Sequence, residues 1–518
     1  MDRVDQARAD IGELIGDPAL TYRQRVQALA MAAENLLEPP LVSSACMAAI
    51  DAGIVCDMGE GHAPYRPRYT LPDYQALVAN GSEFLELPAP STFDDATTLL
   101  LAAYANVPSI TGYPVWFGDL DAVLAPFADE LDDDDLRAAL RRFWILLDRL
   151  FPDAFAHANL GPADSRLARE VLAIHRDARQ VVPNLTLKVD PEATPDALVL
   201  EAMRTVAAVG QPHVVNHPMM VADLGERYGV VSCYNSLPVG GGSHTLVRLN
   251  LHAAAQAHTG PATTFVTTTL PVYAELAAEL IESRVRFLVE AAGFFDHSWL
   301  VAEGLLSLDR FTAMFGVFGL AECVAHLRAG LDGRYGHDAA ANELAHEIVA
   351  AVAALVAERP MAYCEATAGR ALPHSQAGLD SDEGVTAGAR IPVGEEPDVY
   401  QHLRVVAPNH RHFASGVSDI VRLDDTLADN PQAAVDITAG ALAMGMRDVT
   451  FEVDGGEFVR VTGYLVRRAD LAHLAASPDH GVRHSSTVLG AASFTNAALD
   501  TRTVQRVRSH ERDARPRR

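Results

Sequence analysis

A cysteine and a glycine, far apart in the chain, have the residue types and settings that could carry unusual chemistry. Cys233 lies in the run Val-Val-Ser-Cys-Tyr-Asn, soon followed by a proline and three consecutive glycines. Gly463 lies in Arg-Val-Thr-Gly-Tyr, within a short apolar run where strand propensity favours a bulky residue. A turn or bulge explains most isolated glycines in such runs. The glycine therefore gains meaning only together with the cysteine.

The two stretches together resemble the two halves of a glycyl radical enzyme, a glycine loop near the C-terminus and a cysteine loop in mid-chain. An unpaired electron on a glycine Cα is delocalised over the adjacent amide and carbonyl groups when these stay coplanar, and a side chain would resist that flattening. A cysteine S–H bond is weak enough to give its hydrogen to such a radical. The resemblance implies that Gly463 stores the radical and that Cys233 becomes the thiyl.

The same resemblance implies how the radical is made. A separate activating enzyme, which uses S-adenosylmethionine and an iron–sulfur cluster, would remove a hydrogen atom from Gly463. No cofactor would be bound by the chain itself, and no metal is expected. The expected partners are this activase and a small-molecule substrate, and a homodimer is considered.

Several longer segments are similar to one branch of these enzymes, the YjjI family. They are residues 108–114, 303–311, 364–397, 416–420 and 458–471. The resemblance implies a ten-stranded β/α barrel, in which two parallel five-stranded half-sheets are joined antiparallel inside a helical shell. Burial at the barrel centre would protect a radical from solvent and oxygen. The segment from about residue 446 would have to swing out for activation.

Apolar patterning supports an α/β architecture independently of that resemblance. Residues 185–189, 213–216 and 229–232 are typical of strands, and 197–209 of a helix between the first two, which favours parallel pairing. Residues 363–397 are expected to form a long functional loop. We expect a mainly helical part over 1–180, a barrel body over 181–445 and a radical segment over 446–518, in one structural domain.

Composition limits the other classes of function. The formal net charge is −27 with a pI near 5.1, which argues against nucleic acid as a partner. The start of the chain has no apolar export signal, and the uncharged run 348–357 is too short to span a bilayer. The five cysteines are odd in number and include no CxxC pair, as expected of reduced thiols. We therefore expect a cytoplasmic protein.

The neighbours of Cys233 leave the reaction open. Pyruvate formate-lyases carry two adjacent cysteines, whereas Cys233 lies between a serine and a tyrosine. Well-known dehydratases and decarboxylases of the superfamily carry a glutamate two residues after the cysteine, where this chain has Asn235. The expected function is hydrogen abstraction from a small polar metabolite by a lyase, transferase or reductase. An acyltransferase or a dehydratase within the superfamily is the alternative.

Candidate partners of Cys233 follow from residue type. Acid–base candidates are His217, Glu303, Glu365 and His374. Arg370 and Arg390 are candidates for binding an anionic substrate, although structural ion pairing is favoured for both. A histidine trio in residues 402–412 matches no strong metal signature.

Two functions of another class remain open. One is a hydrolase with a nucleophilic Cys233 and His213 or His217 as its base, and the other is a catalytically silent binding protein. The hydrolase would leave the Gly463 motif unexplained.

Overall fold

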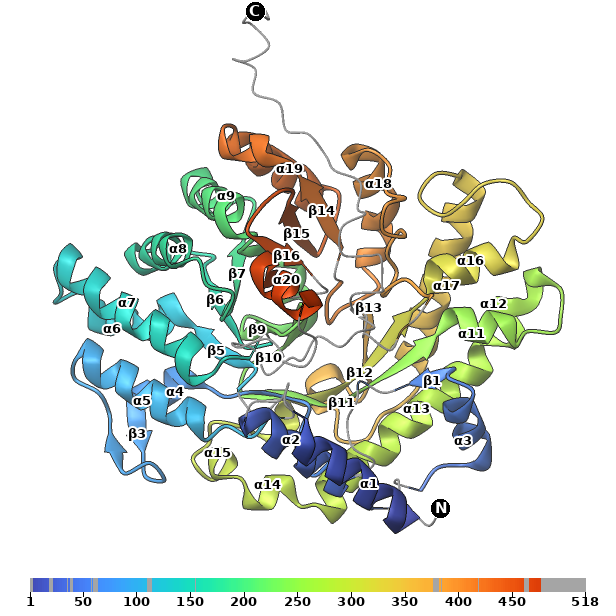
Figure 1. Ribbon diagram of the computed structural model, residues 1–518, viewed down its shortest axis with the longest axis horizontal. Coiled ribbons are helices and arrows are strands. Elements are labelled where there is room, and N and C mark those ends of the chain that lie inside the picture. The colour runs from blue at the N-terminus through green and yellow to red at the C-terminus, as the bar shows by residue number, and fades with distance from the viewer. Residues whose placement is uncertain are drawn as a thin grey trace, which may run out of the picture.

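Strands lie in the interior of the protein and helices surround them (Figure 1). The computed structural model describes residues 3–17, 22–34, 36–37, 41–56, 58, 64–109, 114–153, 155–375, 382, 384–417, 419–460 and 465–476. The helices of the first half of the described chain are α1 (Arg3–Gly16), α2 (Tyr22–Glu34), α3 (Ser44–Asp51), α4 (Tyr74–Asn80), α5 (Phe93–Ala105), α6 (Leu120–Ala128), α7 (Asp133–Leu150), α8 (Arg166–Ala178), α9 (Asp196–Val209) and α10 (His217–Leu224). Those of the second half are α11 (Leu251–Gln256), α12 (Phe265–Thr268), α13 (Leu270–Arg286), α14 (Phe294–His297), α15 (Trp299–Ala302), α16 (Leu320–Leu327), α17 (Ala339–Glu358), α18 (Val399–His410), α19 (Pro431–Ala443) and α20 (Arg468–Ala476).

The first large sheet has the strand order β14-β15-β8-β7-β6-β5. Its strands are β5 (Trp116–Asp119), β6 (His157–Leu160), β7 (Asn184–Val189), β8 (His213–Asn216), β14 (Ile420–Leu423) and β15 (Asp448–Val453). Strands β5 to β8 are parallel, as are β14 and β15, and helices α8 and α9 supply the crossovers between β6, β7 and β8. The parallel pairing predicted for 185–189 and 213–216 is confirmed.

The second large sheet contains three parallel strands and two antiparallel neighbours. Its strands are β1 (Val55–Cys56), β2 (Tyr69–Leu71), β11 (Gly241–Asn250), β12 (Phe311–Phe318) and β13 (Leu372–Ser375). Strands β11, β12 and β13 are parallel, while β1 and β2 both pair antiparallel with β11. A single parallel bridge from Ser375 to Val417 links the end of β13 to the segment that leads into β14.

Antiparallel pairs connect the parallel strands to other strands: one joins two parallel sets, as the sequence resemblance implies, and the other adds β2 to the edge of a parallel set. One junction pairs β8 with β15, and the other pairs β2 with β11. The glycine run after the hairpin that carries Cys233 serves the second junction, because a Cβ on Gly242 would lie 2.0 Å from the Tyr69 carbonyl oxygen. Glycine is required here by the close approach of another backbone.

Polar and apolar residues alternate along the central strands. In β6, Ala158 and Leu160 belong to the main hydrophobic core. His157 and Asn159 instead bond to the backbone of residues 230–232, which lie inside the sheet. In β15, Val449 and Phe451 belong to that core, and Asp448 and Thr450 lie on the opposite face. Both faces of these strands are buried. The apolar face packs into the hydrophobic core, and the polar face points toward the interior of the protein.

Three expectations need adjustment. Residues 229–232 are not a strand of the parallel sheet, because β9 (Tyr228–Val231) pairs only with β10 (Asn235–Pro238), antiparallel. The expected loop over 363–397 contains β13, which pairs with the sheet. The apolar run 348–357 belongs to α17, which is long and apolar enough to cross a membrane by composition, and which contacts α13, α16 and α18 as a helix of the shell.

Residues 1–180 contribute strands as well as helices. Strands β1, β2, β5 and β6 lie in this part and pair within the two large sheets. The aspartate run before α7 acts as a helix start, since the Asp132 side chain accepts a hydrogen bond from the Asp135 amide. The remaining short strands, β3 (Gly81–Ser82) and β4 (Leu87–Pro88), form a separate hairpin. The three-part division of the chain stays a prediction.

Candidate active site

Cys233 lies at the tip of the β9–β10 hairpin, deep in the protein. Its side chain is 4% exposed. The residues on either side, Ser232 and Tyr234, have φ angles of 52° and 70°. Non-glycine residues rarely adopt this left-handed conformation, and its cost is commonly met at functional sites. The local structure therefore holds the cysteine in a fixed turn.

Side chains from the inner faces of the parallel strands hold the hairpin backbone. Asn159 accepts a hydrogen bond from the Val230 amide at 2.8 Å and donates one to the Val230 carbonyl at 2.9 Å. Lys188 donates to the Tyr228 carbonyl at 2.8 Å and pairs with Asp119 at 2.6 Å. Lys188 is the sole lysine of the sequence and is 3% exposed. These bonds fix one side of the hairpin from its base toward its tip.

The histidines beside the tip are neutral. His157 donates from Nδ1 to the Ser232 carbonyl at 3.0 Å, so its Nε2 accepts from the Thr186 hydroxyl at 2.7 Å. Burial, with the nearby Arg460 charge, lowers the pKa of His157 to about 3. Burial and the same arginine lower the pKa of His213 well below its usual value. Since both ring nitrogens of His157 are bonded elsewhere, it is a poor base for the Cys233 thiol.

Arg460, the last described residue before Gly463, contacts the hairpin. Strands β16 (Phe458–Arg460) and β17 (Leu465–Arg467) pair antiparallel, with Arg460 opposite Leu465. Residues 461–464, and so Gly463 itself, lie outside the described residues. Arg460 is 1% exposed and donates to the Tyr234 hydroxyl at 3.2 Å, the Phe451 carbonyl at 3.2 Å and the Gly210 carbonyl at 2.6 Å.

Two sequence motifs therefore meet at one contact. Arg460 ends the strand that leads into the Gly463 segment, and Tyr234 follows Cys233 directly in the chain. The Tyr234 ring also packs edge-on against His213, at 4.5 Å between ring centroids. The structure thus brings Arg460, the described residue of the glycine stretch, to the residue that follows Cys233.

A glycine-containing turn supports the hairpin from its other side. Ser415 accepts a hydrogen bond from the Ser236 amide at 2.8 Å through its carbonyl oxygen. A Cβ on Gly416 would lie 1.9 Å from the Tyr234 carbonyl oxygen and 3.8 Å from Cε1 of His374. His374 is fully buried and donates from Nδ1 to the Ser415 carbonyl at 3.2 Å. His374 is therefore brought close to the cysteine hairpin.

A buried carboxyl group adjoins the same turn. Asp448 accepts from the Val417 amide at 2.9 Å through Oδ2, and its Oδ1 has no hydrogen-bond partner among the described residues. Burial raises the pKa of Asp448 to about 7, although the nearby His410 acts in the opposite direction. His410 accepts from the Arg447 amide at Nδ1 and therefore donates from Nε2 to Asp419 at 2.9 Å. Asp448 is thus able to hold a proton near neutral pH.

Tyr69 hydrogen-bonds the hairpin tip through the Ser232 side chain, and the charge of Arg390 acts on Tyr234. Burial raises the pKa of Tyr69, whereas the charge of Arg68 and hydrogen bonds to the Arg68 and Ser232 side chains act against this rise. A negative charge on Cys233 adds to the rise in the pKa of Tyr69. Arg390 is 4% exposed, and its charge opposes the burial-driven rise in the pKa of Tyr234. Of the two arginines proposed from the sequence, Arg390 is the one whose charge acts on Tyr234, and it also helps to lower the pKa of the buried Asp419.

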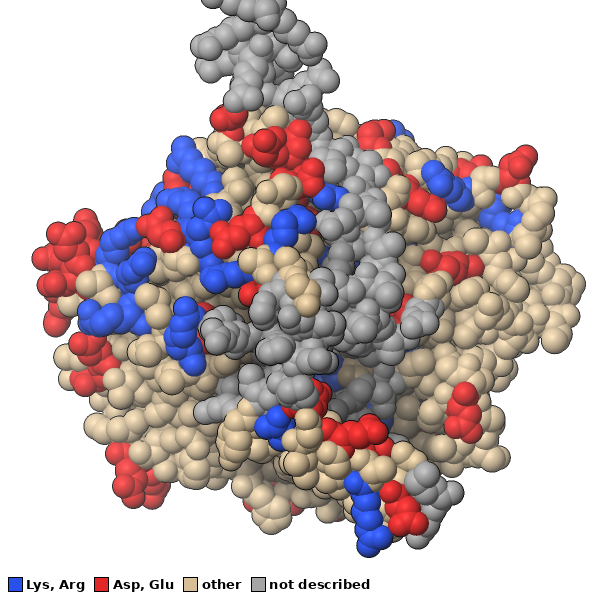
Figure 2. All heavy atoms as spheres, in the orientation of Figure 1, with Lys and Arg blue, Asp and Glu red and all other residues tan. Residues whose placement is uncertain are grey.

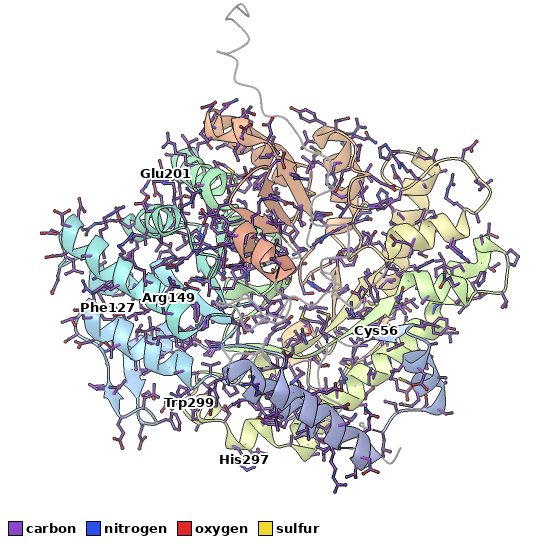
Figure 3. The ribbon with its side chains drawn as sticks, viewed as in Figure 1. Cys56, Phe127, Arg149, Glu201, His297 and Trp299 are labelled. Atoms are coloured by element: carbon purple, nitrogen blue, oxygen red, sulfur yellow. The ribbon has the colours of Figure 1, made fainter. Side chains whose placement is uncertain are left out.

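The other acid–base candidates lie elsewhere. His217 bonds the Tyr228 hydroxyl at 3.0 Å, at the opposite end of β9 from the tip. Glu303 accepts from the Ser82 hydroxyl and the Phe84 amide, at 3.0 and 2.6 Å, beside α15 in the outer layer that includes Trp299 (Figure 3). Glu365 is exposed.

Arg370 has a structural role. It donates to the carbonyl oxygens of Ala357 and Gly369 at 2.7 and 2.8 Å. Its guanidinium group therefore ties together backbone segments near the end of α17.

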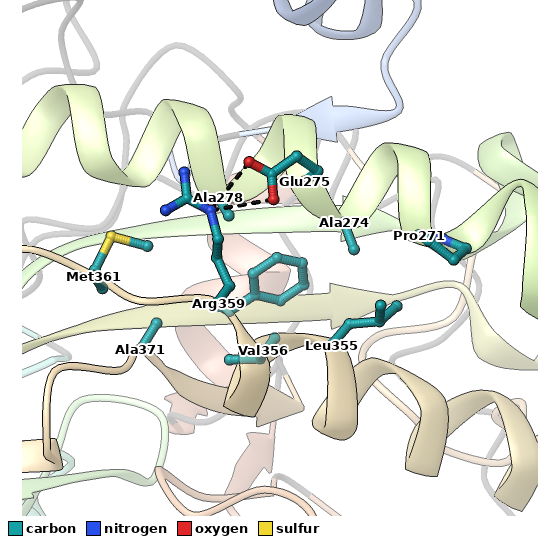
Figure 4. A pocket seen from close by; sticks show the side chains of 10 residues that line it. Pro271, Ala274, Glu275, Ala278, Leu355, Val356, Arg359, Met361 and Ala371 are labelled. Atoms are coloured by element: carbon teal, nitrogen blue, oxygen red, sulfur yellow. Dashed lines mark hydrogen bonds and ion pairs between the residues drawn. The ribbon is translucent and has the colours of Figure 1, made fainter.

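Other hollows and charged surfaces offer less chemistry. A mainly apolar pocket lies between α13, β12 and the end of α17, where Arg359 pairs with Glu275 (Figure 4). Arg side chains gather on one face over α8, α9 and α20 (Figure 2). Several of these are ion-paired, including Arg176 with Glu201 and Arg179 with Glu457. Ordinary surface and packing roles account for both features.

Sequence reasoning missed most residues that hold the hairpin. His157, Asn159 and Lys188 lie in short strands that are otherwise apolar. Polar residues at alternate positions of an otherwise apolar, fully buried strand could have indicated that these side chains bond to something in the interior. Arg460 stands three residues before Gly463, and its type alone could have suggested a buried hydrogen-bonding role.

Comparison with known proteins places the chain in a family. The family described as "Glycyl radical enzyme YjjI-like" matches residues 20–505. A protein of Escherichia coli K12, "Uncharacterized protein YjjI", is 46% identical over 509 residues, which cover 97% of each chain. A protein of Haemophilus influenzae is 37% identical over 470 residues, covering 89% of this chain and 91% of the relative.

Solved structures confirm the expected fold. Hydroxyproline dehydratase from Clostridioides difficile has a TM-score of 0.66 at 13% identity, with 96% of this chain and 88% of that chain covered. The anaerobic ribonucleotide reductase from Thermotoga maritima has a TM-score of 0.64 at 12% identity, with 90% and 89% covered. The B12-independent glycerol dehydratase from Clostridium butyricum has a TM-score of 0.59 at 11% identity, with 90% and 75% covered. At these identities the likeness concerns the fold alone.

Proposed function

The chain belongs to the YjjI-like family of glycyl radical enzymes, and on that premise we propose that Gly463 stores an unpaired electron that Cys233 uses for catalysis. The observation that supports this pairing is the hydrogen bond from Arg460 to the Tyr234 hydroxyl. It joins the strand leading into the Gly463 segment to the residue that follows Cys233. A radical relay requires its two ends to lie close together in a protected interior.

The proposed relay has two balanced steps. The Gly463 radical takes a hydrogen atom from the Cys233 S–H, which restores glycine and leaves a thiyl radical. The thiyl then takes a hydrogen atom from a C–H bond of a small polar metabolite, which restores the S–H group and leaves a substrate radical. After rearrangement, the product radical takes a hydrogen atom from the Cys233 S–H, and the thiyl radical that results takes a hydrogen atom from Gly463, which regenerates the glycyl radical.

The proposed first radical is made by a partner protein. Glycyl radical enzymes are activated by enzymes that use S-adenosylmethionine, and we assign such an activase to this chain. The neutral state of His157 suits a hydrogen-atom relay, because this histidine is unable to draw a proton from the thiol at neutral pH. His374 is the sequence-derived acid–base candidate that the geometry supports best. A cytoplasmic location agrees with the need for a reducing compartment.

Electron paramagnetic resonance spectroscopy tests this assignment without knowledge of the substrate. Anaerobic incubation with the activase and S-adenosylmethionine is expected to give a doublet, from one remaining hydrogen on the Gly463 Cα. Gly463→Ala is expected to abolish it, whereas Gly440→Ala, in helix α19 with no atom within 4 Å of the added Cβ, serves as the matched control. If the doublet is absent although the activase is shown to work, the assignment of the radical to Gly463 is refuted.

The partnership with Cys233 has its own test. In D2O the thiol exchanges its hydrogen for deuterium, and reversible transfer to Gly463 would collapse the doublet to a singlet. Cys233→Ser is expected to retain the doublet and block the collapse, because an O–H bond is too strong for the glycyl radical. Collapse in the serine variant at the normal rate would separate Cys233 from the relay.

A further inference from the structure

One buried side chain links the strand before Gly463 to the cysteine hairpin and to a third segment. Arg460 is 1% exposed and ends β16, which lies beside β15 (Figure 1). Its three guanidinium nitrogens donate to separate acceptors: Nη2 to the Gly210 carbonyl at 2.6 Å, Nη1 to the Tyr234 hydroxyl at 3.2 Å and Nε to the Phe451 carbonyl at 3.2 Å. A lysine has a single nitrogen on a flexible stem, so it is unable to reproduce this fork.

The Gly210 turn also contacts the residue that follows the glycine segment. Leu465 is the register partner of Arg460 across the β16–β17 hairpin. It belongs to a small hydrophobic cluster apart from the main core, and a Cβ on Gly210 would lie 3.3 Å from its Cδ2. The two residues that flank 461–464 are therefore held at one turn. Gly463 is three residues from one of them and two from the other, so the position of this turn limits where the glycine can lie.

Tyr234 is the second fixed point that Arg460 contacts. Tyr234 follows Cys233 directly in the chain, and its φ is 70°. Its ring packs edge-on against His213, at 4.5 Å between ring centroids, and a Cβ on Gly416 would lie 1.9 Å from its carbonyl oxygen. Because neighbours confine both its ring and its backbone, a hydrogen bond to its hydroxyl group fixes the donor relative to the cysteine turn.

We propose that Arg460 is a positioning residue for the radical relay. By bonding the Gly210 turn and Tyr234 at once, it fixes the glycine segment relative to the cysteine turn. This inference rests on the proposed radical function. A hydrogen atom moves only between atoms in near contact, and a displacement of about 1 Å can slow a reaction by about a hundredfold. Arg460 exchanges no atom with the radical and acts through the two segments that it bonds.

The rate at which the doublet collapses in D2O tests this role separately from stability. Collapse requires a deuterium atom to pass from the Cys233 sulfur to the Gly463 Cα and a hydrogen atom to return. The full-length protein is activated and held below its unfolding temperature. Arg460→Gln is expected to form the doublet and to slow its collapse about tenfold to a hundredfold, and Arg460→Lys, which keeps the charge, to slow it by a smaller factor.

An arginine of the same hairpin supplies the matched control. Arg467 in β17 donates to the Arg179 carbonyl at 2.8 Å and has a more exposed side chain than Arg460. Arg467→Gln therefore also removes an arginine bond to a backbone carbonyl, but it leaves the contact with the cysteine hairpin intact. Its doublet is expected to collapse at the wild-type rate.

Tyr234→Phe decides the question if the Arg460 variants fold or activate poorly, because it leaves the guanidinium group in place and removes one acceptor. The same slowing is expected. Collapse at the wild-type rate in the variants of both residues would overturn the inference even if their unfolding temperatures fall, since a purely structural role changes stability and leaves exchange in the folded protein unchanged. Equal slowing in Arg467→Gln would also overturn it.

Failure of the radical function gives a different result. A wild-type protein that forms no doublet refutes the radical on Gly463, and a wild-type doublet that never collapses in D2O refutes the relay with Cys233. A wild-type doublet that collapses, together with variants that collapse equally fast, refutes only the positioning role of Arg460.

Discussion

Replacing Gly416 by alanine is expected to displace the turn that carries Cys233. The added Cβ would lie 1.9 Å from the Tyr234 carbonyl oxygen, whereas real Cβ contacts essentially never fall under 3.0 Å. The carbonyl must therefore move by about 1 Å, because this neighbour is backbone and has no rotamer to change. Gly416 also has a φ of +115°, which an alanine rarely adopts. Overpacking and backbone strain together predict a loss of roughly 2–5 kcal/mol in the free energy of unfolding.

The same substitution has a local signature beyond stability. Cys233 is 4% exposed in the native structure, so it should react slowly with iodoacetamide. In Gly416→Ala we expect faster alkylation of Cys233, measured by peptide mass spectrometry below the unfolding temperature, and a smaller glycyl doublet after activation. Gly440→Ala is the control, and the better helix propensity of alanine should stabilise it by up to about 1 kcal/mol. A Gly416→Ala protein with native stability and native Cys233 reactivity would refute the described contact.

Two further changes test neighbouring contacts. Asp448→Asn removes a group whose pKa is raised from 3.8 to about 7, so the native state binds the extra proton between these values and loses stability as pH rises through them. Relative to the wild type, the free energy of unfolding of the variant should therefore rise by about 2–3 kcal/mol from pH 5 to pH 8, and a pH-independent difference would contradict this. Tyr234→Phe removes the acceptor of the Arg460 bond, and we expect about 1–3 kcal/mol less stability and faster proteolysis after Arg460, whereas an unchanged cleavage rate would show that the bond does not hold the segment.

The chemistry of the site could be predicted from the sequence better than the arrangement of the strands around it. Cys233 and Gly463 are recognisable because radical chemistry restricts residue type, and the glycines and proline around Cys233 marked a loop. Strand β9 was assigned to the parallel sheet because Val230 and Val231 have the composition of a buried strand, and local pattern contains no information on the partner strand. The hairpin is instead placed by Asn159 and Lys188, which are distant in the chain.

The acid–base and anion-binding candidates show the same limit. By residue type alone, Glu303 and His374 were equally good candidates. Only the fold shows that Glu303 bonds to the outer β3–β4 hairpin, whereas His374 lies beside Gly416. Arg390 and Arg370 are likewise both arginines in an irregular stretch, yet the charge of Arg390 acts on Tyr234, whereas Arg370 bonds backbone carbonyls. Such distinctions depend on long-range contacts that a single sequence does not display.

The burial of Lys188 makes the protein unusual toward amine-directed chemistry. Since the sole lysine is 3% exposed and engaged by Asp119 and the Tyr228 carbonyl, acylating dyes and lysine-bridging cross-linkers have no exposed side-chain amine to attack in the folded state. Labelling should therefore be confined to the α-amino group, which gives a single point for attachment to a surface or a fluorophore. Acylation of Lys188 would instead report that the base of the cysteine hairpin has opened.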